Sequence, residues 1–155
     1  MLFFAETRWR QKTLGRVVNP DGVGKQRDRL MKGVALALRH LATRSTVDDE
    51  TRDLVAFMAL ALNEIHDNVD IACLAWEKRD YWLKADQFRR DWAWAGKTAD
   101  KLERVVLGDQ WQNLAELVPA LAKNLEKVTL PKRNSLGTPW VGSFVQLKNE
   151  READA

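Results

Sequence analysis

One apolar stripe constrains the fold of this chain more than any other feature of its sequence. Between residues 81 and 106, apolar side chains recur at alternating spacings of four and three: Tyr81, Ala85, Phe88, Trp92, Ala95, Ala99, Leu102 and Val106. This spacing places side chains on one face of an α-helix, whereas a half-buried strand has a period of two. The stripe therefore predicts one long amphipathic helix that packs against other helices.

A second helix is expected to precede this one, beginning after Ser45 or Thr46, either of which can cap its free N–H groups. Its apolar face comprises Leu54, Met58, Ala61, Ile65, Val69, Ala72 and Trp76. At about 100° per residue, this face points about 160° away from that of the following helix. We therefore expect a break or sharp bend within Glu77–Tyr81, with Asp80 as the new N-cap.

Two further helices are expected at either end of this pair. The first covers about Lys25 to Thr43, after turn-forming residues 19–22, and has an apolar face of Leu30, Val34, Ala37 and Leu41. The last follows Gly108, begins with a capping arrangement of Asp109 and Gln112, and runs to about Val128. Pro119 must kink that helix or start a new one.

From Thr129 onwards the sequence predicts an irregular tail. Its apolar residues are too many for a free linker, so they are expected to dock on the helices: Trp140, Val141, Phe144, Val145 and Leu147. Residues 149–155 are expected to be frayed.

The expected fold class is all-α, because short connections between long helices favour antiparallel neighbours. The arrangement predicted is an up-and-down antiparallel bundle of four main helices with the irregular apolar tail docked on it. A chain of 155 residues fits a single domain. Its parts are a basic N-terminal arm (1–24), the bundle (25–128) and the tail (129–155).

Charge is distributed unevenly along the chain, although the formal net charge is only +3. Lys and Arg outnumber Asp and Glu in residues 1–44, and the reverse holds in residues 45–77. The two segments either neutralise each other by packing together, or the basic one faces an external polyanion.

The third helix carries a cationic face opposite its apolar stripe. Trp94 lies two residues after Trp92 and hence about 200° around the helix. The residues on this face are Arg90, Trp94, Lys97, Lys101 and Arg104. Either the tail or the N-terminal segment covers Trp94, or Trp94 stacks on a base while the cations hold phosphates.

The basic N-terminal arm can extend the same cationic footprint. Its candidate contact residues are Arg8, Arg10, Lys12 and Arg16.

A polar patch on the second helix is the candidate metal site. Its residues are Glu64, His66, Asp67 and Asp70, whose carboxylate and imidazole groups suit zinc, iron or manganese. The Glu-x-x-His pairs of carboxylate-bridged bundles are missing from the sequence, and the patch points away from the apolar face. A solvated helix face is therefore the preferred interpretation, and no cofactor is expected.

Other kinds of site have little support in the sequence. The isolated Cys73 lies on an apolar helix, which predicts a buried inert thiol in a reducing compartment. The longest uncharged apolar run, 55–62, falls far short of the ~20 residues of a membrane helix. We expect a cytoplasmic protein without a membrane partner.

These observations favour a non-enzymatic interaction or architectural subunit, part of an oligomer or a larger complex. The cationic face is expected to bind the nucleic-acid backbone, RNA rather than DNA, within a ribonucleoprotein-type assembly. By size, charge and helicity the chain resembles small helical subunits of such assemblies, including those of CRISPR effector complexes, though no motif supports this analogy. The alternatives are a protein-only adaptor or homodimerising bundle, and a metal-dependent helical-bundle enzyme.

Overall fold

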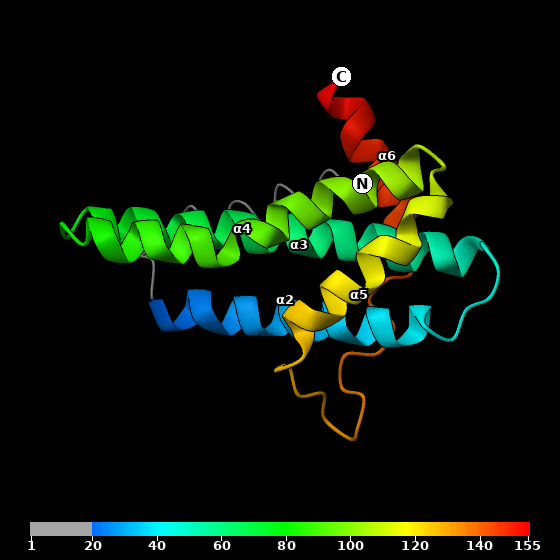
Figure 1. Cartoon of the computed structure of the whole chain (residues 1–155), viewed down its shortest axis with the longest axis horizontal. Helices are drawn as coiled ribbons and strands as arrows, with labels where there is room; N and C mark the ends of the chain where they lie inside the picture. The colour runs from blue at the N-terminus through cyan, green and yellow to red at the C-terminus, as the bar shows by residue number, and fades with distance from the viewer. Residues whose placement is uncertain (1–19) are drawn as a thin grey trace.

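The computed structural model describes residues 20–155, and every regular element in that range is a helix (Figure 1). The elements are α2 (Pro20–Leu41), α3 (Asp49–Glu77), α4 (Trp82–Leu107), the 3-10 helix η1 (Trp111–Asn113), α5 (Leu114–Leu125) and α6 (Ser143–Asp154). The all-α fold class is confirmed. The candidate contact residues of the basic arm lie outside the described residues: Arg8, Arg10, Lys12 and Arg16.

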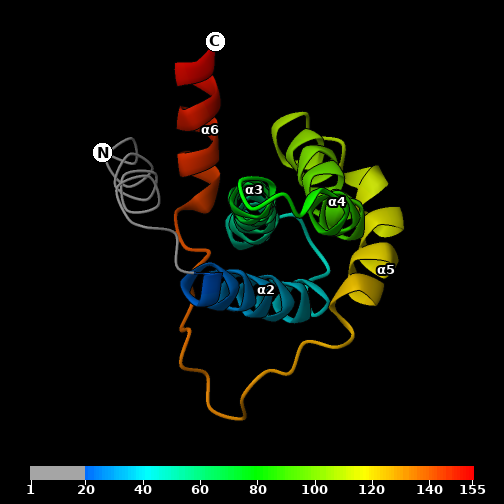
Figure 2. The same cartoon turned by 90° about the vertical axis from the view of Figure 1, so that its left-hand side faces the viewer.

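The central element is α3, which packs against α2, α4 and α6 (Figure 2). Its fully buried side chains include Leu54, Met58, Leu62 and Ile65. Helices α3 and α4 form a long antiparallel hairpin, whereas α6 stands across their direction in both views. The finer prediction, a four-helix up-and-down bundle, is therefore not confirmed.

The break between α3 and α4 falls within the predicted segment, since α3 ends at Glu77 and α4 begins at Trp82. Asp80 does not cap α4, however: it lies inside the turn with a φ of +62°, and Tyr81 occupies the N-cap position. Asp tolerates this left-handed conformation better than most residues, which allows the chain to reverse. The N–H of Tyr81 closes the turn by donating to the Trp76 carbonyl at 3.0 Å.

The predicted apolar stripe of α4 holds over most of its length. Ala85, Ala95, Ala99, Leu102 and Val106 are buried, and the two larger aromatics, Phe88 and Trp92, pack against the core. Tyr81 is the exception, because it is exposed at the end of the hairpin.

The start of α3 is capped by Asp48 rather than by Ser45 or Thr46. One carboxylate oxygen of Asp48 accepts hydrogen bonds from the Thr51 N–H and hydroxyl, each at 2.8 Å. These bonds lower the pKa of Asp48. The carbonyl of Thr46 lies 2.9 Å from the same Thr51 hydroxyl and shares its single proton with Asp48.

The outer boundaries of the helices also differ from the sequence prediction. Residues 20–22 are the first turn of α2 rather than a connecting turn, which agrees with the tolerance of that position for proline. Pro119 lies inside α5 and starts no new helix. Asp109 has a φ of +55° and accepts a bond from the Trp111 indole, so it does not form the predicted capping arrangement with Gln112.

The C-terminal segment is not an irregular tail throughout, because residues 143–154 form α6. Its first N–H groups are capped from another helix: the Asp53 carboxylate accepts from Gly142 at 3.1 Å and from Phe144 at 3.0 Å. Trp140 and Leu147 are buried as predicted. Val141 and Val145, in contrast, are exposed and do not dock.

Within residues 20–155, no helix combines the length and apolarity that crossing a membrane requires.

Candidate nucleic-acid interface

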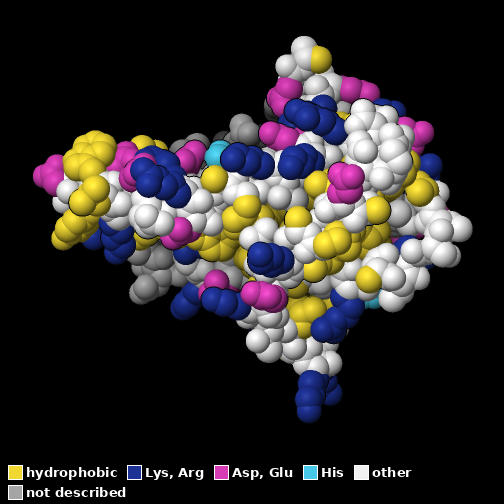
Figure 3. All heavy atoms as spheres, in the orientation of Figure 1, with side chains coloured by type: hydrophobic (Ala, Val, Ile, Leu, Met, Phe, Trp, Pro, Cys, Tyr) yellow, Lys and Arg dark blue, Asp and Glu magenta, His cyan; other side chains and the backbone are white. Residues whose placement is uncertain are grey.

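Three cations follow one face of α4 without an ion-pair partner among the described residues. Lys97, Lys101 and Arg104 are all exposed, while most other arginines of α3, α4 and α6 pair with carboxylates. At 1.5 Å per residue, the three positions are separated by about 6 Å and about 4.5 Å along the helix. Figure 3 shows Lys and Arg side chains along the upper edge of the hairpin, over α4. Their charge is available to an external anion.

Nearby carboxylates reduce the positive charge available on the rest of the predicted cationic face. Arg90 is exposed but pairs with Asp86 at 2.7 Å, one turn away. Glu103 pairs with Arg151 of α6, and Nη2 of Arg151 donates to Oε2 of Glu103 at 3.2 Å. Asp100 remains as an exposed acid between Lys97 and Lys101. The available positive charge is therefore concentrated at the three unpaired cations.

Trp94 is half-buried rather than fully exposed. Its ring stacks beside that of Trp92, with centroids 5.9 Å apart, and packs against the core. One alternative from the sequence was that the tail or the N-terminal segment covers Trp94. In the structure, Trp92 of the same helix covers part of it. Part of the Trp94 ring is therefore accessible beside the cations, but the ring is not fully exposed for stacking.

Arg27 and Asn68 link α2 to the α3–α4 hairpin. The sequence analysis did not identify either residue. Arg27 donates to the side chain of buried Asn68 at 2.8 Å, and Asn68 donates to the Val23 carbonyl at 2.8 Å. The Arg27 guanidinium also lies over the rings of Phe88 and Trp92, at 4.8 and 5.3 Å. Burial lowers the pKa of Arg27. Asn68 follows Ile65 by three residues, so its position on the buried face was visible in the sequence.

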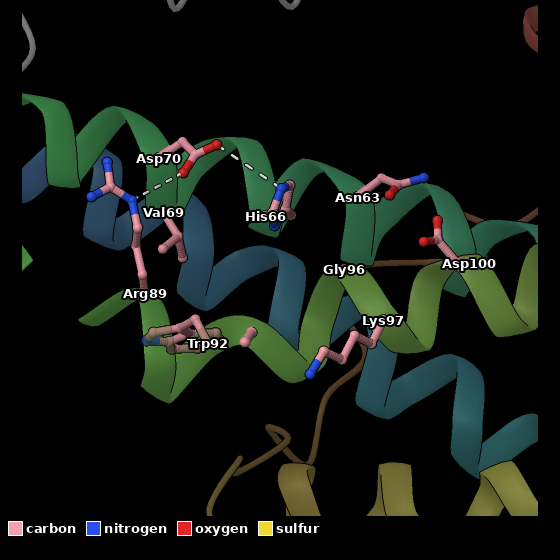
Figure 4. Close-up of a pocket in the computed structure, with 10 residues that line it drawn as sticks. Asn63, His66, Val69, Asp70, Arg89, Trp92, Gly96, Lys97 and Asp100 are labelled. Atoms are coloured by element: carbon pink, nitrogen blue, oxygen red, sulfur yellow. Dashed lines mark ion pairs between the residues drawn. The ribbon is translucent and has the colours of Figure 1, made fainter. Parts of the chain in front are cut away.

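A pocket of about 440 Å³ lies between α3 and α4, next to the unpaired cations (Figure 4). Its lining includes His66, Asp70, Arg89, Trp92 and Lys97. Asp70 forms an ion pair with Arg89 at 3.6 Å, and its other oxygen lies 3.9 Å from Nε2 of His66.

Gly96 leaves room for the His66 side chain at this pocket. A Cβ on residue 96 would lie 3.0 Å from Nδ1 of His66. A larger residue at position 96 would therefore require the His66 ring to move.

The polar patch of α3 does not assemble a metal centre in the described part of the chain. No group of three or more His, Cys, Asp or Glu residues between 20 and 155 is placed to hold a metal ion. His66 and Asp70 line the pocket, while Glu64 and Asp67 do not line it and have interaction partners of their own. The metal-site alternative gains no support.

Cys73 is fully buried, and its thiol donates to the carbonyl of Ala85 at 3.4 Å. Burial raises the pKa of Cys73, which disfavours the reactive thiolate. We predict that an aromatic disulfide reagent labels this thiol at least about 100-fold more slowly in native than in urea-unfolded protein. Equal rates in the two states would contradict the buried position.

A comparison with protein-family models found no match, and comparisons with curated proteins and with solved structures found no significant match.

Proposed function

We propose that this protein is a non-enzymatic subunit that binds the phosphate backbone of nucleic acid through α4, within a ribonucleoprotein-type assembly. The observation that supports this most is the row of unpaired cations, Lys97, Lys101 and Arg104, on one helix face. Phosphate contacts of this kind position a strand without reading its sequence. RNA is preferred to DNA because the chain resembles small ribonucleoprotein subunits in size, charge and helicity.

The physical basis of the proposal is counterion release. Each Lys or Arg that neutralises a phosphate frees a condensed cation, so binding weakens steeply as salt is added. Trp94, half-buried beside this row, supplies an aromatic edge at which one base can rest.

The proposal predicts that removing the three charges lowers affinity for a fluorescein-labelled single-stranded RNA by about tenfold or more at low salt. The variant is Lys97→Gln/Lys101→Gln/Arg104→Gln, measured by fluorescence anisotropy. Because all three side chains are exposed, the variant is expected to retain the fold, which circular dichroism checks.

A matched control removes the same number of charges elsewhere: Lys32→Gln/Arg39→Gln/Lys123→Gln, all exposed. This control is expected to bind within about threefold of the wild type. An equal loss in both variants would mean that net charge alone attracts the RNA, and unchanged binding by the α4 variant would remove the proposed interface.

A protein-only adaptor is the second candidate function. It is favoured by Val141 and Val145, which are exposed on the C-terminal segment. An assembly that survives nuclease and high salt but is lost on Val141→Ser/Val145→Ser would support this candidate over RNA binding.

A further inference from the structure

The end of the α3–α4 hairpin carries a cluster of exposed apolar side chains, here called the hairpin tip. Its members and their exposed fractions are Leu74 at 53%, Tyr81 at 56%, Trp82 at 59% and Leu83 at 87%. Figure 3 shows hydrophobic side chains gathered at this end of the molecule. Contiguous exposed aromatics of this kind mark contact sites, whereas scattered single apolar residues do not.

No other described element reaches the hairpin tip. In Figure 1 the hairpin extends beyond α2, α5 and α6, so none of these helices covers its last turns. This explains why Tyr81, at a core position by periodicity, is exposed. The exposure follows from the lengths of the helices and does not depend on one side-chain conformation.

The shape of the hairpin tip distinguishes between kinds of partner. Trp82 and Leu83 are consecutive in the first turn of α4, so their directions differ by about 100°, while Tyr81 lies at the N-cap and Leu74 on α3. A flat protein surface touches one side of such an end and leaves the opposite side chain in water. A fluid bilayer surrounds a convex tip from all sides.

The charges beside the hairpin tip fit the surface of an anionic bilayer. Lys78 and Arg79 are exposed in the turn and have no ion-pair partner among the described residues, and Lys84 lies over the Trp76 ring at 4.5 Å. Asp80 opposes them, but Asp86 is neutralised by Arg90. Trp and Tyr favour the headgroup level of membranes, where nearby Lys and Arg reach the phosphates.

We propose that the hairpin tip inserts peripherally into the headgroup region of an anionic phospholipid bilayer. Trp82 and Leu83 would enter first, with Lys78 and Arg79 at the phosphates. The sequence-based expectation of no membrane partner rested on the lack of a spanning segment, which peripheral insertion does not need. The proposal is independent of RNA binding by α4.

Sedimentation of the full chain with vesicles of phosphatidylcholine and phosphatidylglycerol tests this proposal. We expect the wild type to bind, and to bind more weakly to phosphatidylcholine alone. The variant Trp82→Ser/Leu83→Ser is expected to lose about tenfold or more in affinity for the mixed vesicles, since both side chains leave water on insertion. The control Val141→Ser/Val145→Ser removes two exposed apolar residues elsewhere and is expected to bind like the wild type.

The α4 charge variant, Lys97→Gln/Lys101→Gln/Arg104→Gln, separates this proposal from RNA binding. It is expected to retain vesicle binding that depends on the hairpin tip even if RNA affinity is lost. Failure of the wild type to bind vesicles, or equal binding by the hairpin-tip variant and its control, would overturn membrane insertion. A dimer in solution that depends on the hairpin tip and does not bind vesicles would also overturn membrane insertion. In that case a second copy of the chain would cover the hairpin tip.

Discussion

Replacing Trp140 by alanine is expected to lower the free energy of unfolding by about 3–5 kcal/mol, the largest single effect we predict. Among residues 20–155, Trp140 is the largest fully buried side chain, and its ring packs against His40 with centroids 4.7 Å apart. It precedes α6, whose N-terminus is capped by Asp53 of α3. Truncation therefore leaves a cavity at the point where the C-terminal segment is anchored.

Equilibrium urea unfolding, followed by circular dichroism, measures this effect. The matched control is Val141→Ala, one residue further along but exposed, which should change stability by less than about 0.5 kcal/mol. A loss below about 1 kcal/mol for Trp140→Ala would show that the C-terminal segment is not part of the cooperative core.

Replacing Asn68 by leucine is expected to cost about 2–3 kcal/mol of unfolding free energy. Within residues 20–155, the buried Asn68 amide connects the Arg27 guanidinium to the Val23 carbonyl, and leucine leaves both groups without that partner. A half-buried cation without its acceptor is costly, because its desolvation is no longer compensated. Thermal and urea unfolding of the single variant measure the cost.

A double-mutant cycle with Arg27→Met separates this bond from simple loss of packing. Removing both polar partners is expected to cost at least about 1 kcal/mol less than the two single substitutions added together. Strict additivity would mean that the Arg27–Asn68 hydrogen bond does not contribute to stability.

Periodicity predicted the helices well, because side-chain spacing reports which face of a helix is apolar. It placed the α4 stripe and the break after Glu77 correctly. It failed at Tyr81, since spacing does not reveal whether a neighbouring helix is long enough to cover a given turn. The missed helix α6 is capped by Asp53, 89 residues before Gly142, and no local pattern shows such a contact.

The candidate interface was predictable to a similar extent. The sequence placed Lys97, Lys101 and Arg104 on one face, and their exposure in the structure agrees with that. The partial cover of Trp94 by Trp92 depends on side-chain conformations within the folded hairpin. The pairing of Glu103 with Arg151 depends on α6, which the sequence analysis did not predict.

The salt dependence of RNA binding tests the central claim most directly. Affinity for single-stranded RNA is measured at several salt concentrations for the wild type and for Lys97→Gln/Lys101→Gln/Arg104→Gln. If the three cations each contact a phosphate, the plot of log affinity against log salt becomes shallower by about 2 in the variant. Salt-independent binding by the wild type, or the same slope in both proteins, would contradict phosphate recognition by α4.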